Sequence, residues 1–149
     1  MKKLLLLAFL TFSTISCKEN KKTLTQINTE ITFKKLDLIK SKPENEIIEF
    51  LKNNNYSLLK TQFDNQWKSE TSDDIVQFTG KGVFCFFTYD IGTYKKLLND
   101  LKKSTYVYFG KSMKNGVEVE TYTKNKELIF LSVIEHPQNG KKVYSFTFL

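Results

Sequence analysis

The chain has 149 residues, 23 basic against 16 acidic side chains, and a formal net charge of +7, and every one of the basic residues is lysine. Thirteen phenylalanines and seven tyrosines supply enough apolar area to exclude a disordered chain, and six glycines with two cysteines exclude a collagen-like or disulfide-dense one. The single histidine, His136, argues against most metal enzymes. Without arginine the chain lacks the bidentate donor that reads phosphates and guanine, so nucleic acid is not an expected partner.

The first sixteen residues have the pattern of a secretory signal peptide. A basic start, Met1-Lys2-Lys3, precedes the apolar run Leu4–Phe12. Nine residues of helix cover only about half of a ~30 Å hydrocarbon core, so this run is too short to span a membrane. We therefore predict a cleaved signal over residues 1–16 and leave it out of the fold. Its removal leaves 21 lysines against 16 acids, a net charge of +5.

Thr14-Ile15-Ser16-Cys17 resembles the lipobox of bacterial lipoproteins, with the small Ser16 before the cysteine and Thr14 where that family usually has leucine. The resemblance implies cleavage before Cys17, diacylglycerol on its thiol and a further acyl chain such as palmitate on its amino group. The charged stretch Lys18–Lys22 resembles the start of surface lipoproteins from AT-rich Bacteroidota. It implies a cell-envelope protein held by lipid, at the outer membrane, facing the periplasm or the surface. The alternative is ordinary secretion, which would leave Cys17 as a free N-terminal thiol.

The mature chain is expected to be a flexible tether, residues 17–30, followed by a single folded domain, residues 31–149. Apolar spacing predicts a short helix over 33–41. A second helix is expected to open at Pro43, whose ring suits a first turn, with Glu44 and Glu46 beside the positive end of the helix dipole. Strands are then predicted over 56–62, 66–70, 75–79 and 83–89.

Residues 83–87 are apolar without alternation. This pattern predicts either a central strand covered on both faces or a strand whose second face meets another chain. Cys85 lies inside this run, where a thiol is expected to behave as a small hydrophobic side chain.

The clearest helix is predicted after Asp90, because Tyr94, Leu97, Leu98 and Leu101 recur at helical spacing on one face. Four strands follow, over 106–111, 117–123, 128–134 and 143–148, and Asn-Gly at 115–116 and 139–140 is typical of tight hairpins. We therefore predict an α+β fold, an antiparallel sheet with two or three helices packed on one face. Each half is a helix followed by strands, a pattern that a duplication would produce.

The search for reactive groups finds one pair of interest. Glu118 and Glu120 share a strand face with Tyr122, and two carboxylates beside a phenol could serve as general acid and base on a glycan. The same pattern is also typical of the solvent-exposed face of a hairpin. No metal ligands, cofactor site or catalytic residues are predicted, and we expect the protein not to be an enzyme.

The aromatic side chains Trp67, Tyr106, Tyr108 and Tyr122 are the candidate ligand or partner surface. The leading hypothesis is a non-enzymatic binding lipoprotein, similar in role to an inhibitor, an immunity protein or an accessory subunit. It would recognise a protein partner by strand addition or by an aromatic patch. The second hypothesis is a carbohydrate-contacting module that stacks sugars on these rings. A glycan hydrolase using Glu118 and Glu120 is the third.

Replacing Cys17 with alanine is expected to abolish the anchor, because that residue carries the acyl chains in this interpretation. Intact mass of the membrane-extracted protein should equal residues 17–149 plus acyl chains, and the Cys17→Ala variant should lose both that mass and its membrane association. If the mature protein has the mass of an unmodified chain and is found in the soluble fraction, the lipoprotein interpretation is wrong.

Overall fold

The computed structural model describes residues 30–60, 65–79, 82–135 and 139–149. The signal peptide, Cys17, the tether up to residue 29 and His136 lie outside the described residues. No described helix is long and apolar enough to cross a membrane.

Two short helices open the described chain. They are α1 (Phe33–Ile39) and α2 (Glu44–Asn53). The hydroxyl of Thr32 caps α1 by accepting a hydrogen bond from the backbone N–H of Lys35 at 3.3 Å. Pro43 stands at the N-cap of α2, followed by the acidic first turn expected from the sequence. The bounds of both helices agree with the predicted helices to within a few residues.

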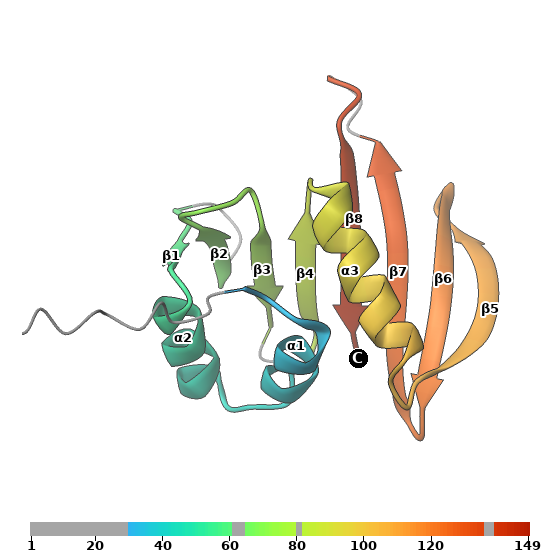
Figure 1. Ribbon diagram of the computed structural model, residues 1–149, viewed down its shortest axis with the longest axis horizontal. Coiled ribbons are helices and arrows are strands. Elements are labelled where there is room, and N and C mark those ends of the chain that lie inside the picture. Colours follow the sequence, from blue (N-terminus) through green and yellow to red (C-terminus); the bar gives the residue numbers. More distant parts are fainter. Residues whose placement is uncertain (1–29, 61–64, 80–81, 136–138) are drawn as a thin grey trace, which may run out of the picture.

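Eight strands form one antiparallel sheet in the order β1-β2-β3-β4-β8-β7-β6-β5. The first half, β1 to β4, follows α1 and α2, and the second half, β5 to β8, follows α3; the two halves meet where β4 pairs with β8 (Figure 1). This arrangement confirms the α+β prediction. The strands are β1 (Tyr56–Leu58), β2 (Gln66–Ser69), β3 (Ile75–Phe78), β4 (Phe84–Thr88), β5 (Val107–Lys114), β6 (Val117–Lys124), β7 (Glu127–Glu135) and β8 (Lys142–Phe148).

The long helix α3 (Ile91–Lys102) links the two halves. Asp90 caps it, because its carboxylate accepts from the backbone N–H groups of Gly92 at 3.1 Å and Thr93 at 2.8 Å. Leu97 and Leu101 are buried, as the helical spacing predicted. The ring of Tyr94 stacks on Tyr144 of β8 with centroids 4.7 Å apart.

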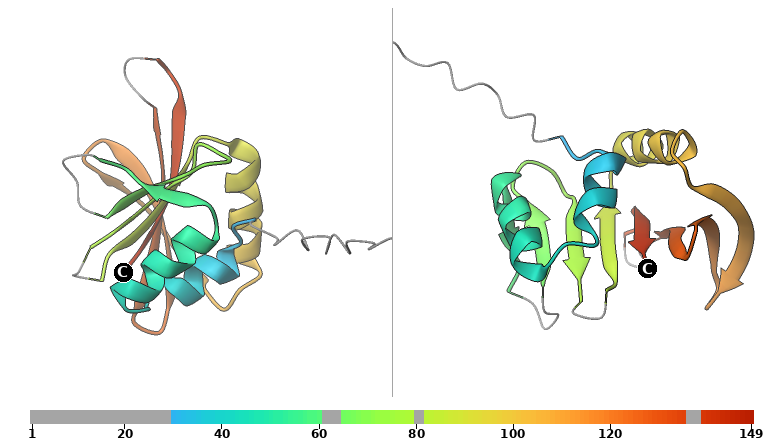
Figure 2. Two further views of the ribbon diagram at one scale, coloured as in Figure 1. Left: turned by 90° about the vertical axis from the view of Figure 1, so that its left-hand side faces the viewer. Right: turned by 90° about the horizontal axis from the view of Figure 1, so that it is seen from below.

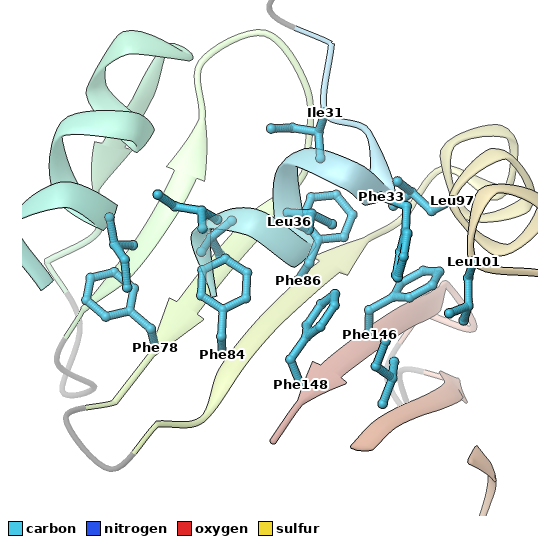
Figure 3. Close-up of a cluster of buried hydrophobic side chains, with 14 of the residues drawn as sticks. Ile31, Phe33, Leu36, Phe78, Phe84, Phe86, Leu97, Leu101, Phe146 and Phe148 are labelled. Atoms are coloured by element: carbon cyan, nitrogen blue, oxygen red, sulfur yellow. The ribbon is translucent and has the colours of Figure 1, made fainter. Parts of the chain in front are cut away.

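All three helices lie on one side of the sheet, and the core fills the space between the two layers (Figure 2). At its centre are four phenylalanines, Phe84 and Phe86 from β4 and Phe146 and Phe148 from β8 (Figure 3). The rings of Phe84 and Phe148 meet edge-on with centroids 5.8 Å apart. Ile31, the first residue of the predicted domain, is already buried in this core.

The central strand β4 is covered on only one face by the described residues. Phe84, Phe86 and Thr88 are buried under the helices, whereas Cys85 and Phe87 point to the other face and are partly exposed. Of the two explanations for the apolar run, a second layer from the described part of this chain is therefore excluded.

Two backbone features shape the strand at one end of the sheet. Asn115 and Gly116 both have positive φ, 51° and 80°, which is the geometry that the Asn-Gly pair was expected to supply for the β5–β6 hairpin. Within β5 the pairing shifts between Tyr108 and Gly110, so Phe109 is an extra residue in a β-bulge. Gly110 adopts φ 150°, a backbone conformation that other residues rarely reach.

Truncating Leu97 tests the contact between α3 and the sheet. Because this side chain is fully buried, Leu97→Ala should lower the free energy of unfolding in urea by roughly 2–5 kcal/mol. The matched change Ile91→Ala, at an exposed position of the same helix, should cost less than about 0.5 kcal/mol. Equal losses at the two positions would contradict the packing described here.

Candidate functional site

The most exposed apolar surface of the described chain lies on the edge strand β5. Val107, Tyr108 and Phe109 are three consecutive large side chains with exposed fractions of 66%, 50% and 78%, and Met113 on the same strand is 67% exposed. We call these four residues the apolar edge patch. Val107 pairs with Thr123 and Tyr108 with Tyr122, so these neighbours point to opposite faces of the sheet, with Phe109 in the bulge beside them. Large apolar side chains exposed together on an edge strand make this edge a candidate interaction surface.

The position of β5 explains this exposure. It pairs only with β6, so its outer backbone groups have no partner strand among the described residues. The bulge places Phe109 outside the regular pairing, and Lys111 and Lys114 follow further along. Bulges and lysines are usual protections of a sheet edge. The stretch 107–109 has the bulge but carries no charge, so protection of an edge does not explain its apolar side chains.

Three of the four aromatic residues expected at a binding surface are in the core, and the prediction is wrong for them. Trp67, Tyr106 and Tyr122 are each 5% exposed or less. Trp67 and Tyr122 point to the helix-covered face of the sheet, and Tyr106 packs edge-on against Phe33 of α1. Alternation along a strand separates its two faces but does not tell which face the helices cover. Only Tyr108 remains at the surface.

Sequence reasoning missed Val107, Phe109 and Met113. Val107 and Phe109 alternate with two tyrosines, and the pattern alone favoured the tyrosines as the surface set. The glycine that follows Phe109 was the available signal, because an isolated glycine inside a strand pattern indicates a bulge.

The exposed ring of Tyr108 does not form a flat platform. It meets buried Tyr122 at an interplanar angle of 67°, with centroids 5.4 Å apart. A pair of coplanar exposed rings is the arrangement that favours stacking on a sugar. Two pairs of rings are stacked among the described residues, Phe33–Phe148 and Tyr94–Tyr144. Each pair includes at least one buried ring and so belongs to the core.

Glu118 and Glu120 do lie side by side, as predicted, and both form an ion pair with the single ammonium of Lys111 on β5. The ammonium lies 2.9 Å from a Glu118 oxygen and 3.2 Å from a Glu120 oxygen. Its hydrogen bonds to the two carboxylates, Glu118 first, raise the pKa of Lys111. The hollow beside them, lined also by Tyr94, Leu131 and Val133, measures about 80 Å³. So small a hollow offers no room for a sugar ring beside the two carboxylates.

A second cluster, which the sequence did not reveal, clasps α1 to the sheet. Lys40 is 7% exposed, and its ammonium lies 2.8 Å from Glu127 Oε2 and 3.1 Å from Asp37 Oδ1. It also donates to the Tyr106 hydroxyl, which in turn lies within hydrogen-bond distance of both carboxylates. Hydrogen bonds from Lys40 and Tyr106 lower the pKa of Glu127. Every member of this cluster is paired with another, which is the signature of a structural clasp.

A cleft of about 600 Å³ opens at the end of the sheet where α3 begins. Its three carboxylates already have structural partners. Asp73 pairs with Lys68 at 2.9 Å, Asp74 accepts from the Ser72 hydroxyl at 2.8 Å, and Asp90 caps α3. The cleft therefore lacks a free acid among its lining carboxylates.

Among the described residues no group of three or more His, Cys, Asp or Glu side chains could hold a metal ion. Cys85 is half-buried, and burial raises the pKa of its thiol, as expected of a small apolar side chain in a sheet. Comparison of the chain with protein-family models, with curated proteins and with solved structures finds no match. The apolar edge patch is the candidate site that the described residues offer.

Stability should fall at low pH through the Lys40 cluster. The pKa of Glu127 is lowered on folding, so its contribution is complete above the unfolded pKa of about 4.3 and is lost as the pH falls through the lower folded value. Urea unfolding between pH 6 and pH 3 should therefore show a shallower decline for Glu127→Gln than for the wild type. Glu49→Gln, an exposed position on α2, is the control and should keep the wild-type slope.

At neutral pH, Lys40→Met should lower the free energy of unfolding by about 1–3 kcal/mol, because two carboxylates and a hydroxyl lose their common donor. A variant as stable as the wild type would show that the cluster does not clasp the helix.

Proposed function

We propose that this chain is an envelope-anchored lipoprotein that acts as a non-enzymatic binding module and contacts a protein partner through the apolar edge patch. The observation that carries this proposal is the run Val107-Tyr108-Phe109, three large apolar side chains exposed in succession on an edge strand. A partner that covered them would remove apolar area from water, the main favourable term in protein association. Aromatic residues and methionine are also enriched at the centres of such interfaces.

Two modes of recognition are open to the partner. The free backbone groups of β5 could pair with an added strand beyond the bulge, over Lys111–Lys114. Alternatively, the partner could offer a pocket for Phe109 and its neighbours. The bulge interrupts regular pairing where the apolar side chains are concentrated, which favours the pocket for residues 107–109.

The anchor in this proposal is Cys17, joined to the described domain by residues 18–29. The described chain begins at Glu30, whose carboxylate forms an ion pair with Lys96 of α3 on the helix layer. The edge strand β5 lies at the end of the sheet, clear of that entry point (Figure 2).

The alternatives receive less support. A carbohydrate-contacting module would use exposed rings, and of the expected set only Tyr108 is exposed, beside the exposed ring of Phe109, which was not expected. A glycan hydrolase would use Glu118 and Glu120, which share an ion pair with Lys111 beside a hollow of only about 80 Å³. We propose no catalytic role for either carboxylate.

A photo-crosslinking amino acid at position 109 tests the proposal in the intact envelope. We expect one discrete adduct with a partner protein, because Phe109 would lie in the buried centre of the contact. The same amino acid at Lys126, an exposed position on the β6–β7 turn, is the control and should give none.

Excess wild-type protein should compete the adduct away, whereas a Phe109→Ser competitor should fail because it lacks the central apolar side chain. No adduct at position 109, or equal adducts at both positions, would refute the proposal.

A further inference from the structure

The positive charge of residues 30–149 is concentrated on two helices. Residues 30–40 and 91–103, the segments of α1 and α3, carry seven lysines against three carboxylates, a net charge of +4. Residues 41–90 and 104–149 together carry eleven lysines against twelve carboxylates, a net charge of −1. The lysines of this chain are therefore not spread evenly over its surface.

Most of the lysines in these two segments lie at the surface of the helix layer. Five are exposed and one is half-exposed, and we call the six the basic helix surface: Lys34, Lys95, Lys96, Lys102 and Lys103, with Lys35 as the half-exposed member. Of the five exposed lysines, only Lys96 forms an ion pair with a described residue. Of the three carboxylates, Glu30 and Asp37 are paired with lysines, and Asp100 is half-buried. The surface therefore has an excess of positive charge that the described chain does not balance.

The two helices of this surface meet where the described chain begins. Both α1 and α3 lie on the same side of the sheet (Figure 2). Glu30 links them, because its carboxylate forms an ion pair with Lys96 of α3 and its backbone carbonyl accepts a hydrogen bond from the Lys35 ammonium of α1 at 2.9 Å. The chain that comes from Cys17 thus reaches the domain at the basic helix surface.

We infer that the basic helix surface lies against the anionic phospholipid headgroups of the membrane that holds the anchor. This inference rests on the lipid anchor at Cys17 in the proposed function. An anionic leaflet attracts lysines close to its surface, and each lysine typically strengthens the binding by about fivefold. The attraction falls off within a Debye length, about 8 Å at physiological ionic strength, so only side chains that face the bilayer contribute.

The position of the anchor favours the membrane as the occupant of this surface. Residues 18–29 separate Cys17 from Glu30, and even a fully extended chain of this length spans at most about 45 Å. The residues next to the anchor are themselves basic, with Lys18, Lys21 and Lys22 against Glu19. The anchor therefore holds the basic helix surface close to one leaflet, at the high effective concentration of an intramolecular contact.

Vesicle binding tests the inference with the mature chain, residues 17–149, in which Cys17→Ala removes the acyl chains. Vesicles with about 30% phosphatidylglycerol in phosphatidylcholine should bind this chain in a sedimentation assay, because the lysines meet an anionic surface. Raising the salt from about 50 mM to about 500 mM should release it. Vesicles of phosphatidylcholine alone should not bind it.

Reversal of charge locates the contact. Lys95→Glu together with Lys102→Glu should weaken the partition onto anionic vesicles by at least about tenfold, because two lysines are lost from the contact and two carboxylates are added. The matched control, Lys126→Glu together with Lys142→Glu, changes the net charge equally at exposed positions outside the two helices. It should weaken the partition by less than about threefold. Unchanged circular dichroism and melting temperature would show that each variant is folded.

Three outcomes of these assays would overturn the inference. The first is no binding of the Cys17→Ala chain to anionic vesicles at low salt, and the second is an equal loss for the two pairs of substitutions. The third concerns Phe109→Ser, which should leave vesicle binding unchanged. A loss in this variant as large as that of the α3 pair would assign the contact to the apolar edge patch instead.

The orientation of the anchored domain is tested with the full lipidated chain in the same vesicles. A fluorescent non-natural amino acid in place of exposed Asn99 on α3 should be quenched strongly by a quencher attached to lipid headgroups. The same amino acid in place of Ser57, which is exposed on the face of the sheet opposite the helices, should be quenched weakly. Equal quenching at the two positions would contradict the inference. A failure of the anchor would appear in the mass of the membrane-extracted protein, and a failure of the partner contact in the adduct at position 109, so the three can be told apart.

Discussion

The antiparallel pairing of β4 with β8 is the contact on which the rest of the structure depends. It joins two four-stranded halves into one sheet and aligns Phe84 with Phe148 and Phe86 with Phe146. The resulting block of four phenylalanines is the surface on which the helices pack. Because the two strands are far apart in the sequence, closing this contact costs chain entropy that the aromatic core has to offset.

This pairing also decides which edges the sheet exposes. Because β4 and β8 pair with each other, β1 and β5 are the two edge strands of the sheet. β1 is only three residues long and offers few backbone groups for pairing with a partner. β5 is eight residues long and has a bulge at Phe109. The two ends of a topologically symmetric sheet therefore differ in what they can bind, and the apolar edge patch belongs to only one of them.

Several ion pairs lie on the helix-covered side of the sheet. On the helix side the carboxylates near β5–β7 have lysine partners, Lys111 with Glu118 and Glu120, and Lys40 with Glu127. Lys111 of β5 is shared by two carboxylates of β6, and Lys40 links the end of α1 to β7. The opposite face has no described helix above it, and the ammonium of Lys114 lies over it, 3.9 Å from the centroid of the Phe130 ring. The most exposed apolar side chains lie on the edge strand β5, which is why we look for a binding partner at that edge instead of for reactive groups.

The sequence by itself determined the elements, because hydrophobic periodicity, the Asp90 cap, Pro43 and the Asn-Gly turn at 115–116 are local properties of the chain. It also predicted the α+β class and the shared face of Glu118 and Glu120. Only the tertiary structure decided which face the helices cover, and so buried Trp67, Tyr106 and Tyr122 while leaving Phe109 exposed. Period-2 alternation separates two faces but is the same whichever face is covered. The Lys40 cluster likewise needed the fold, because its members meet across 87 residues of sequence.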